Sequence, residues 1–157
     1  RIEARREGHL RMSEHSLWEF LKSVLPNGHY SRIESPDTAP GHPDVTYQIA
    51  RASGVIELKD AQYPNRIPPF KGIEDGLHLS QLGWIKQNLV FGGRVWIVAR
   101  VGIRIYWIPG ENAPRFNGCE RLERLSSWVL TGTKLTNVDV QVIRKMLEGT
   151  YTNGNDD

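Results

Sequence analysis

The chain lacks the features of disulfide-bonded and membrane-spanning proteins. It has one cysteine, Cys119, among 157 residues, so no disulfide can form within the chain and a reducing compartment is allowed. No apolar run free of charges is long enough to span a bilayer. No apolar signal-peptide region follows the charged N-terminus. We therefore expect a cytoplasmic protein with no membrane partner.

The chain also lacks a strong excess of charge of either sign. Its formal net charge is +2 and its sequence pI is near 8.8, which is too mild to identify a nucleic-acid-binding protein. Residues 81–134 nevertheless carry eight Lys or Arg against three Asp or Glu. A modestly basic face of this kind suits a phosphate backbone. Ordinary solvated surface charge explains any single one of these residues equally well.

Length and composition predict one domain with a substantial core, because 39% of the residues are hydrophobic. We expect residues 1–12 to be an N-terminal arm or an expression remnant, since Met12 can be a natural start. Residues 13–149 are predicted to form the single domain. Residues 150–157 are expected to be a disordered tail.

Two short strand patterns joined by a turn organise this domain. Residues 45–49 alternate apolar and polar side chains, and residues 55–59 form a second short strand pattern. Side chains alternate between the faces of a strand, so Glu57 and Lys59 share one face. A hairpin would bring Asp44, at the start of the first strand, close to both of them.

This grouping of two carboxylates and a lysine indicates a particular chemistry. Two close carboxylates repel each other, and a divalent cation such as Mg²⁺ relieves the repulsion. A lysine beside such a cation can orient or deprotonate a water, or help to bind a phosphate. The group is therefore typical of metal-assisted phosphodiester hydrolysis. The alternative is a solvated hairpin edge on which Glu57 and Lys59 merely pair.

Pro43-Asp44 followed by Glu57-Leu58-Lys59 resembles the PD-(D/E)xK nuclease superfamily. Residues 79–85, Leu-Ser-Gln-Leu-Gly-Trp-Ile, are similar to the helix start that follows this strand in its VRR-NUC branch. Residues 92–98 are similar to the glycine turn and apolar strand that close the family's core. The resemblance covers roughly residues 14–106, about two thirds of the chain. It implies an α/β, restriction-endonuclease-like and Holliday-junction-resolvase-like core with a central four-stranded mixed sheet flanked by helices.

The resemblance further implies an endonuclease that hydrolyses DNA phosphodiesters with Mg²⁺ or Mn²⁺. The residues implied are, for the metal, Glu14, Asp44, Glu57 and the carbonyl of Leu58, and, for catalysis, Asp44, Glu57, Lys59 and Gln81. Glu14 has an equal alternative role, because an acid near a helix N-terminus complements the helix dipole. Without the resemblance, Gln81 would be read as a solvent-facing residue of the first helical turn.

Periodicity and breaker residues predict the remaining elements. The expected helices span residues 13–25, 80–91 with Ser80 as N-cap, 119–130 and 137–148, and further strands are expected at 29–34, 94–100 and 103–108. The last two helices lie outside the resembled core, as two extra C-terminal helices. Residues 60–78 are expected to form a long loop that borders the site.

Four basic or aromatic side chains are candidates for DNA contacts. They are His42, Arg66, Lys71 and Lys86. In the long loop, Tyr63 and Phe70 are further candidates for stacking on bases. The alternative for each is an ordinary surface residue, with Ile67 and Phe70 holding the loop against the domain.

Two other functions compete with the nuclease interpretation. One is a DNA-binding module of the same fold that does not cut, and the other is a structural protein that binds partners through its C-terminal helices. For the nuclease we predict a homodimer that prefers branched DNA, since symmetric cutting of a junction needs two sites. The candidate dimer surfaces are the strand at 103–108 and, preferred, the C-terminal helices. A virus-encoded enzyme that acts in its host cell would fit the VRR-NUC resemblance.

Overall fold

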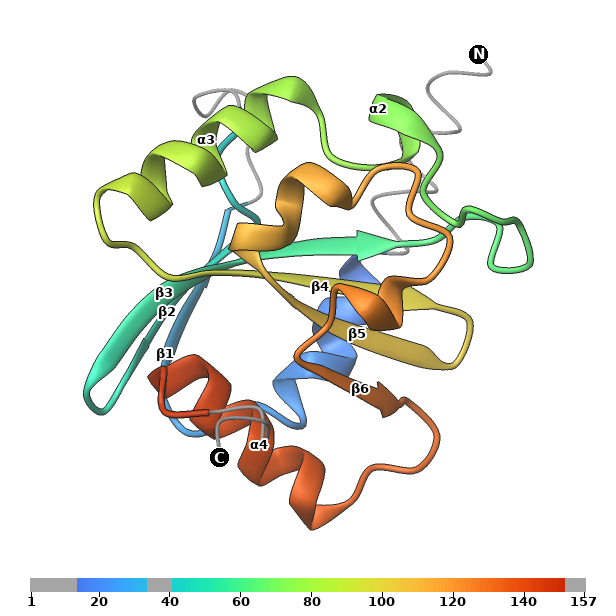
Figure 1. Ribbon diagram of the computed structural model, residues 1–157. Coiled ribbons are helices and arrows are strands. Elements are labelled where there is room, and N and C mark those ends of the chain that lie inside the picture. The colour runs from blue at the N-terminus through green and yellow to red at the C-terminus, as the bar shows by residue number, and fades with distance from the viewer. Residues whose placement is uncertain (1–13, 34–40, 152–157) are drawn as a thin grey trace, which may run out of the picture.

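The computed structural model describes residues 14–33 and 41–151 (Figure 1). The expected arm at 1–12 and most of the expected tail at 150–157 lie outside these residues. Thr150 and Tyr151 are described, and their backbone nitrogens donate to the carbonyl of Lys145. No helix in the described part of the chain is long and apolar enough to cross a membrane.

Within the described residues, one six-stranded sheet forms the centre of the fold, with its strands arranged in chain order. They are β1 (His29–Arg32), β2 (Val45–Ile49), β3 (Ala52–Asp60), β4 (Val95–Val101), β5 (Arg104–Pro109) and β6 (Trp128–Thr131). β3 and β4 pair in parallel, and the other neighbours pair antiparallel. The expected α/β class with a mixed sheet is confirmed. The expected count of four strands is wrong.

Helices cover both faces of this sheet (Figure 1). One face carries the N-terminal helix, described over residues 14–22, and α4 (Asn137–Glu148). The other face carries α3 (Leu79–Val90) and the 3-10 helices η1 (Gly110–Arg115) and η2 (Leu122–Arg124). The expected loop at 60–78 contains a single turn of helix, α2 (Gly72–Asp75).

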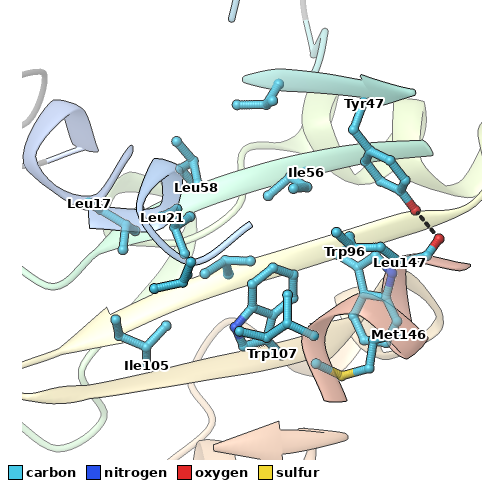
Figure 2. Packing of buried hydrophobic residues seen from close by; sticks show 14 of the residues in the cluster. Leu17, Leu21, Tyr47, Ile56, Leu58, Trp96, Ile105, Trp107, Met146 and Leu147 are labelled. Carbon is cyan, nitrogen blue, oxygen red and sulfur yellow. Dashed lines mark hydrogen bonds between the residues drawn. The ribbon is translucent and has the colours of Figure 1, made fainter. Parts of the chain in front are cut away.

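The sheet therefore separates two hydrophobic cores. In β4, Trp96 and Val98 face the core beneath the N-terminal helix and α4, while Ile97 and Ala99 face the core beneath α3. A strand buried on both faces reads as a continuous apolar run, which is the pattern seen in the sequence. In the first core the Tyr47 hydroxyl donates to the carbonyl of Leu147 at 3.0 Å, which joins β2 to the end of α4 (Figure 2).

The prediction of a helix at 119–130 is wrong. Leu122 and Leu125 are buried at a three-residue spacing, which imitates a helical face, but this segment forms only the short 3-10 helix η2, and the Ser126 hydroxyl donates to the carbonyl of Leu122 just after it. The chain then extends as β6 and pairs antiparallel with β5. Only one of the two predicted C-terminal helices is present in the described residues. β5 thereby becomes an internal strand, which removes residues 103–108 as an edge for dimerisation.

The predicted helix at 137–148 is confirmed as α4. Its N-cap, Thr136, accepts from the backbone of Asp139, and its C-cap, Gly149, has a φ of 77° that favours glycine. Asp139 is buried and also accepts a hydrogen bond from Trp128 Nε1 at 2.9 Å. This bond fixes the one C-terminal helix to the edge strand β6.

Candidate carboxylate and lysine site

Two charged residues are buried on one face of β3. Glu57 is 2% exposed and Lys59 is 7% exposed, and both point to the side of the sheet that carries α3, as does Val55 in the second core. The predicted alternation along this strand is therefore confirmed. Buried charges need partners, because their desolvation is otherwise strongly unfavourable.

Asp44 supplies one partner from the neighbouring strand. The register pairs Val45 with Ile56, so continuing it by one residue sets Asp44 opposite Glu57. The Asp44 carboxylate accepts a hydrogen bond from the backbone nitrogen of Leu58 at 2.7 Å. The predicted closeness of Asp44 to the end of β3 is thus observed.

The segment that leads into Asp44 runs tightly against the start of α3. Gly41 has a φ of 85°, and a Cβ atom there would lie 2.2 Å from the backbone oxygen of Ser80. A side chain does not fit at this position, so glycine is required for the approach. The close approach brings the start of β2 and the start of α3 to the same end of the sheet.

Gln81 joins the carboxylate and the lysine from the first turn of α3. Its Nε2 donates to Glu57 Oε1 at 2.6 Å, and its Oε1 accepts from Lys59 Nζ at 3.3 Å. The same oxygen accepts from the backbone nitrogen of His78 at 2.9 Å. His78, and not the predicted Ser80, is the N-cap of α3. Gln81 therefore does not simply face solvent, because one amide holds both buried charges of β3.

The electrostatics of Glu57 reflect this crowding. Burial raises the pKa of its carboxyl well above the usual value, and the charge of Asp44 raises it further. Lys59 acts in the opposite direction and lowers the pKa. Asp44 also shares a side-chain hydrogen bond with Glu57 that favours the protonated form. The Glu57 carboxyl therefore holds a proton readily when no cation is close to it.

Glu14 approaches the same group from the opposite layer. Burial raises its pKa from 4.5 to about 7, the charge of Asp44 adds to the rise, and Lys59 and Arg32 oppose it. Glu14 lies at the start of the described N-terminal helix, so its side chain and Gln81 come from helices on different faces of the sheet. Among residues 14–33 and 41–151, however, no group of three or more His, Cys, Asp or Glu is arranged to hold a metal ion.

Of the four candidate DNA contacts, two are exposed and two contact other side chains of the protein. Lys71 and Lys86 are exposed and available to a ligand. The ring of His42 lies 5.7 Å from that of Trp84 and packs against it. Arg66 forms an ion pair with Asp75.

Arg66 also lies over the ring of Tyr63, with its Cζ 5.2 Å from the ring centroid. Phe70 cannot stack on a base, because it is 2% exposed and its ring centroid lies 4.9 Å from that of Phe116. It holds the loop against the second core. Ile67 does not share this role, because it is 74% exposed.

Sequence reasoning missed one ion pair and one hydrogen-bonded arginine near the site. Asp60 directly follows Lys59 and forms a two-bond ion pair with Arg100, at 3.1 and 2.5 Å. The parallel register sets these two residues side by side, which no local pattern reveals. Arg32, at the end of β1, donates from Nη1 to His15 Nδ1 at 2.9 Å, because a guanidinium group has donors only.

The fold and the site together define an α/β domain with a buried carboxylate, lysine and amide group near the carboxyl end of its parallel strand pair. No protein-family model matches the sequence, and no curated protein matches it. Among solved structures, the chain is similar to Hjc, a Holliday junction resolvase from the archaeal hyperthermophile Archaeoglobus fulgidus. The two are 18% identical over 62% of this chain and 74% of that chain, with a TM-score of 0.37. Likeness at this level carries no argument about activity, so a function must be argued from the site itself.

Proposed function

We propose that this protein is a divalent-metal-dependent endonuclease that hydrolyses DNA phosphodiesters, as a member of the PD-(D/E)xK superfamily. The observation that carries the proposal is the buried pair Glu57 and Lys59 on one face of β3, with Asp44 set opposite Glu57 by the strand register. A structural hairpin edge would leave such charges in water. Here they are buried and held by Gln81.

The donor set suits Mg²⁺ or Mn²⁺. Mg²⁺ binds through one or two carboxylates and keeps several waters, so Asp44, Glu57 and the carbonyl of Leu58 are sufficient protein ligands. The raised pKa of Glu57 fits this role, because crowded carboxylates gain most from a bound cation. Glu14 would join as an outer ligand or through a water, since it does not form a preassembled three-residue group with them. Such a cation, when bound, supplies Lewis-acid stabilisation of the charge that develops on the phosphate.

The chain's own residues supply positioning. Lys59 would hold a water or a phosphate oxygen beside the carboxylates, and the hydrogen bond from its Nζ to Gln81 supports this role by restricting its direction. Gln81 in turn fixes Glu57, and its own oxygen is fixed by the start of α3. We infer that this network orients the reacting groups before substrate binds.

A cleavage panel tests the proposal. Branched, linear and single-stranded DNAs are incubated with Mg²⁺, Mn²⁺ or EDTA, using wild type, Asp44→Asn, Glu57→Gln and Lys59→Met. We expect cleavage only with a metal, and a loss of about 100-fold or more in each variant. Glu111→Gln, at an exposed acid on η1, is the matched control and should cut normally. Full activity in any of the three site variants, once purified and folded, contradicts the assignment.

A silent DNA-binding module predicts a different result. It would bind DNA without needing the carboxylates, and it would not bind Mn²⁺. Titration calorimetry with Mn²⁺ separates the two, because the nuclease predicts binding that is lost in Asp44→Asn and Glu57→Gln. If the protein is instead a structural protein, we expect it to have no affinity for nucleic acid even at low salt.

Three finer features stay predictions: a homodimer, a preference for branched over linear DNA, and action inside a reducing cell compartment. β5 no longer offers a dimer edge, and α4 packs one face against β3. Val138, at the start of α4, is 57% exposed and belongs to the remaining candidate surface. Light scattering joined to competition binding with branched and linear DNA tests the first two. A monomer at micromolar concentration, or equal affinities, contradicts them without affecting the nuclease assignment.

A further inference from the structure

A groove runs along one face of α3, and one of its lining residues, Trp84, also packs against the second core. Its volume is about 480 Å³. It is lined by Ser80, Gly83, Trp84, Gln87, Asn88, Phe91 and Gly93. The first six of these follow the i, i+3, i+4, i+7, i+8, i+11 spacing of one helix face, so they form one continuous stripe on the helix. The opposite stripe of α3 packs into the second core through Leu82, Ile85 and Leu89.

Two aromatic rings stand along this groove. Trp84 is half-buried and is supported by the ring of His42, whereas Phe91 is 86% exposed. They are seven residues apart, about 10 Å along a helix axis. Gly83 adds no side chain to the groove, and a Cβ there would meet nothing within 4 Å. The groove is therefore open, with flat apolar rings and small or amide side chains in its lining.

The chain that forms and follows α3 carries no acid. Residues 76–110 contain no Asp or Glu, and the basic residues on or beside the groove are Lys86 and Arg94. Lys86 is exposed on α3 itself. Arg94 lines an adjoining hollow of about 380 Å³ that shares Asn88 and Gly93 with the groove. A polyanion lying along α3 would thus meet no carboxylate from this stretch of the chain.

One end of the groove lies one residue from the candidate site in the chain. Gln81, which binds Glu57 and Lys59, lies in the turn of α3 that contributes Ser80. The helix has 12 residues, which makes it about 18 Å long. At about 3.4 Å per nucleotide, that length matches roughly five nucleotides of one strand.

We propose that this face of α3 binds unpaired nucleotides of the strand whose phosphodiester lies at Glu57 and Lys59, with Trp84 and Phe91 stacking on bases. Internal base pairs of a duplex are already stacked on both sides, so exposed rings stack most readily on unpaired bases. The amides of Gln87 and Asn88 suit base edges or backbone oxygens without imposing a sequence. The inference deepens the proposed function, on which it rests, because it names substrates with a single-stranded stretch beside the cut.

Binding in EDTA tests this proposal without requiring cleavage. Fluorescence anisotropy compares a labelled oligothymidine with a blunt duplex for wild type, Phe91→Ala and Gly83→Glu. Phe91→Ala should weaken oligothymidine binding roughly 5- to 100-fold, and Gly83→Glu should weaken it by placing a carboxylate in the groove. Duplex affinity should stay unchanged in both. The matched control is Val90→Ala, at a 72% exposed apolar neighbour. Gly83→Gln adds the same bulk without the charge, so its comparison with Gly83→Glu separates the effect of charge from that of bulk.

Unchanged oligothymidine binding in both Phe91→Ala and Gly83→Glu overturns the proposal, as does an equal loss for duplex and single strand. A wild-type dimer that Gly83→Glu converts to a monomer, with oligothymidine affinity intact, would assign this face to a second copy instead. The cleavage panel is a separate readout. If the protein never cuts but Phe91 and Gly83 control single-strand binding, the nuclease proposal fails and this binding face stands. If Asp44 and Lys59 control cleavage while both α3 variants bind normally, the nuclease proposal stands and the proposed binding face on α3 fails.

Discussion

The sharpest test of the site's electrostatics is Glu14→Gln in metal-free protein. Burial, with help from Asp44, raises the Glu14 pKa from 4.5 to about 7, so the folded state favours the protonated form. Below pH 4.5 both folded and unfolded chains are protonated, and Glu14 has no effect on the pH dependence. Between pH 4.5 and 7 the unfolded chain ionises first, so wild type loses stability as pH rises.

The size of this loss follows from the pKa difference. At about 1.4 kcal/mol per pKa unit, the rise corresponds to about 3 kcal/mol, reached above pH 7. Glutamine keeps the shape and cannot ionise. Metal-free Glu14→Gln should therefore match wild type near pH 4.5 and exceed its unfolding free energy by about 3 kcal/mol at pH 8. For a chain of this size, that equals roughly 6–12 °C in Tm.

Urea unfolding in EDTA at pH 4.5, 6, 7 and 8 measures this difference. Glu19→Gln is the matched control on the same helix. Its carboxylate is exposed, and the hydrogen bond from Lys22 lowers its pKa, so its loss should not stabilise the protein at high pH. Equal stability of wild type and Glu14→Gln at pH 8 would refute the reasoning, because it would mean that Glu14 ionises without strain in the folded protein.

Three further outcomes follow from the contacts. Gln81→Ala should lower the cleavage rate roughly 10- to 100-fold, because it removes the hydrogen bonds that hold both Glu57 and Lys59. The cleavage rate is measured against Mg²⁺ concentration, and an unchanged rate would contradict this prediction. Saturating Mg²⁺ should raise the Tm of wild type more at pH 8 than at pH 5, as scanning calorimetry can show, since ligand carboxylates must be ionised. Asp139→Ala should cost about 2–4 kcal/mol in urea unfolding without changing metal binding, because it removes the carboxylate that accepts from the N-cap residue Thr136 and leaves Trp128 Nε1 unpaired.

Local signals in the sequence were enough for the hairpin and for α4. The alternation at 45–49 and 55–59 fixed which face of β3 carries Glu57 and Lys59. The predicted helix at 137–148 has the bounds of α4, because its cap at Thr136 and its glycine stop at Gly149 are both local. These features depend on residues within a few positions of one another.

Features that depend on distant partners were not predictable in this way. The spacing of Leu122 and Leu125 fits a helix as well as a 3-10 turn, and only the free edge of β5 selects a strand for the residues that follow. Phe70 lies in a proline-rich loop, and its burial depends on Phe116, more than 40 residues away. The pairing of Asp60 with Arg100 likewise requires the parallel register of β3 and β4.

The site combines residues that local sequence patterns predict with residues that only distant contacts bring in. Asp44, Glu57 and Lys59 come from one local hairpin, whereas Gln81 and Glu14 arrive from helices on opposite faces of the sheet. A purely structural role would favour partners that neutralise these charges. Instead Glu14 adds a third acid to a region already rich in carboxylate, and it raises the pKa of Glu57 further. If Glu14→Gln stabilises the metal-free protein but abolishes cleavage, then Glu14 is retained for function and not for stability.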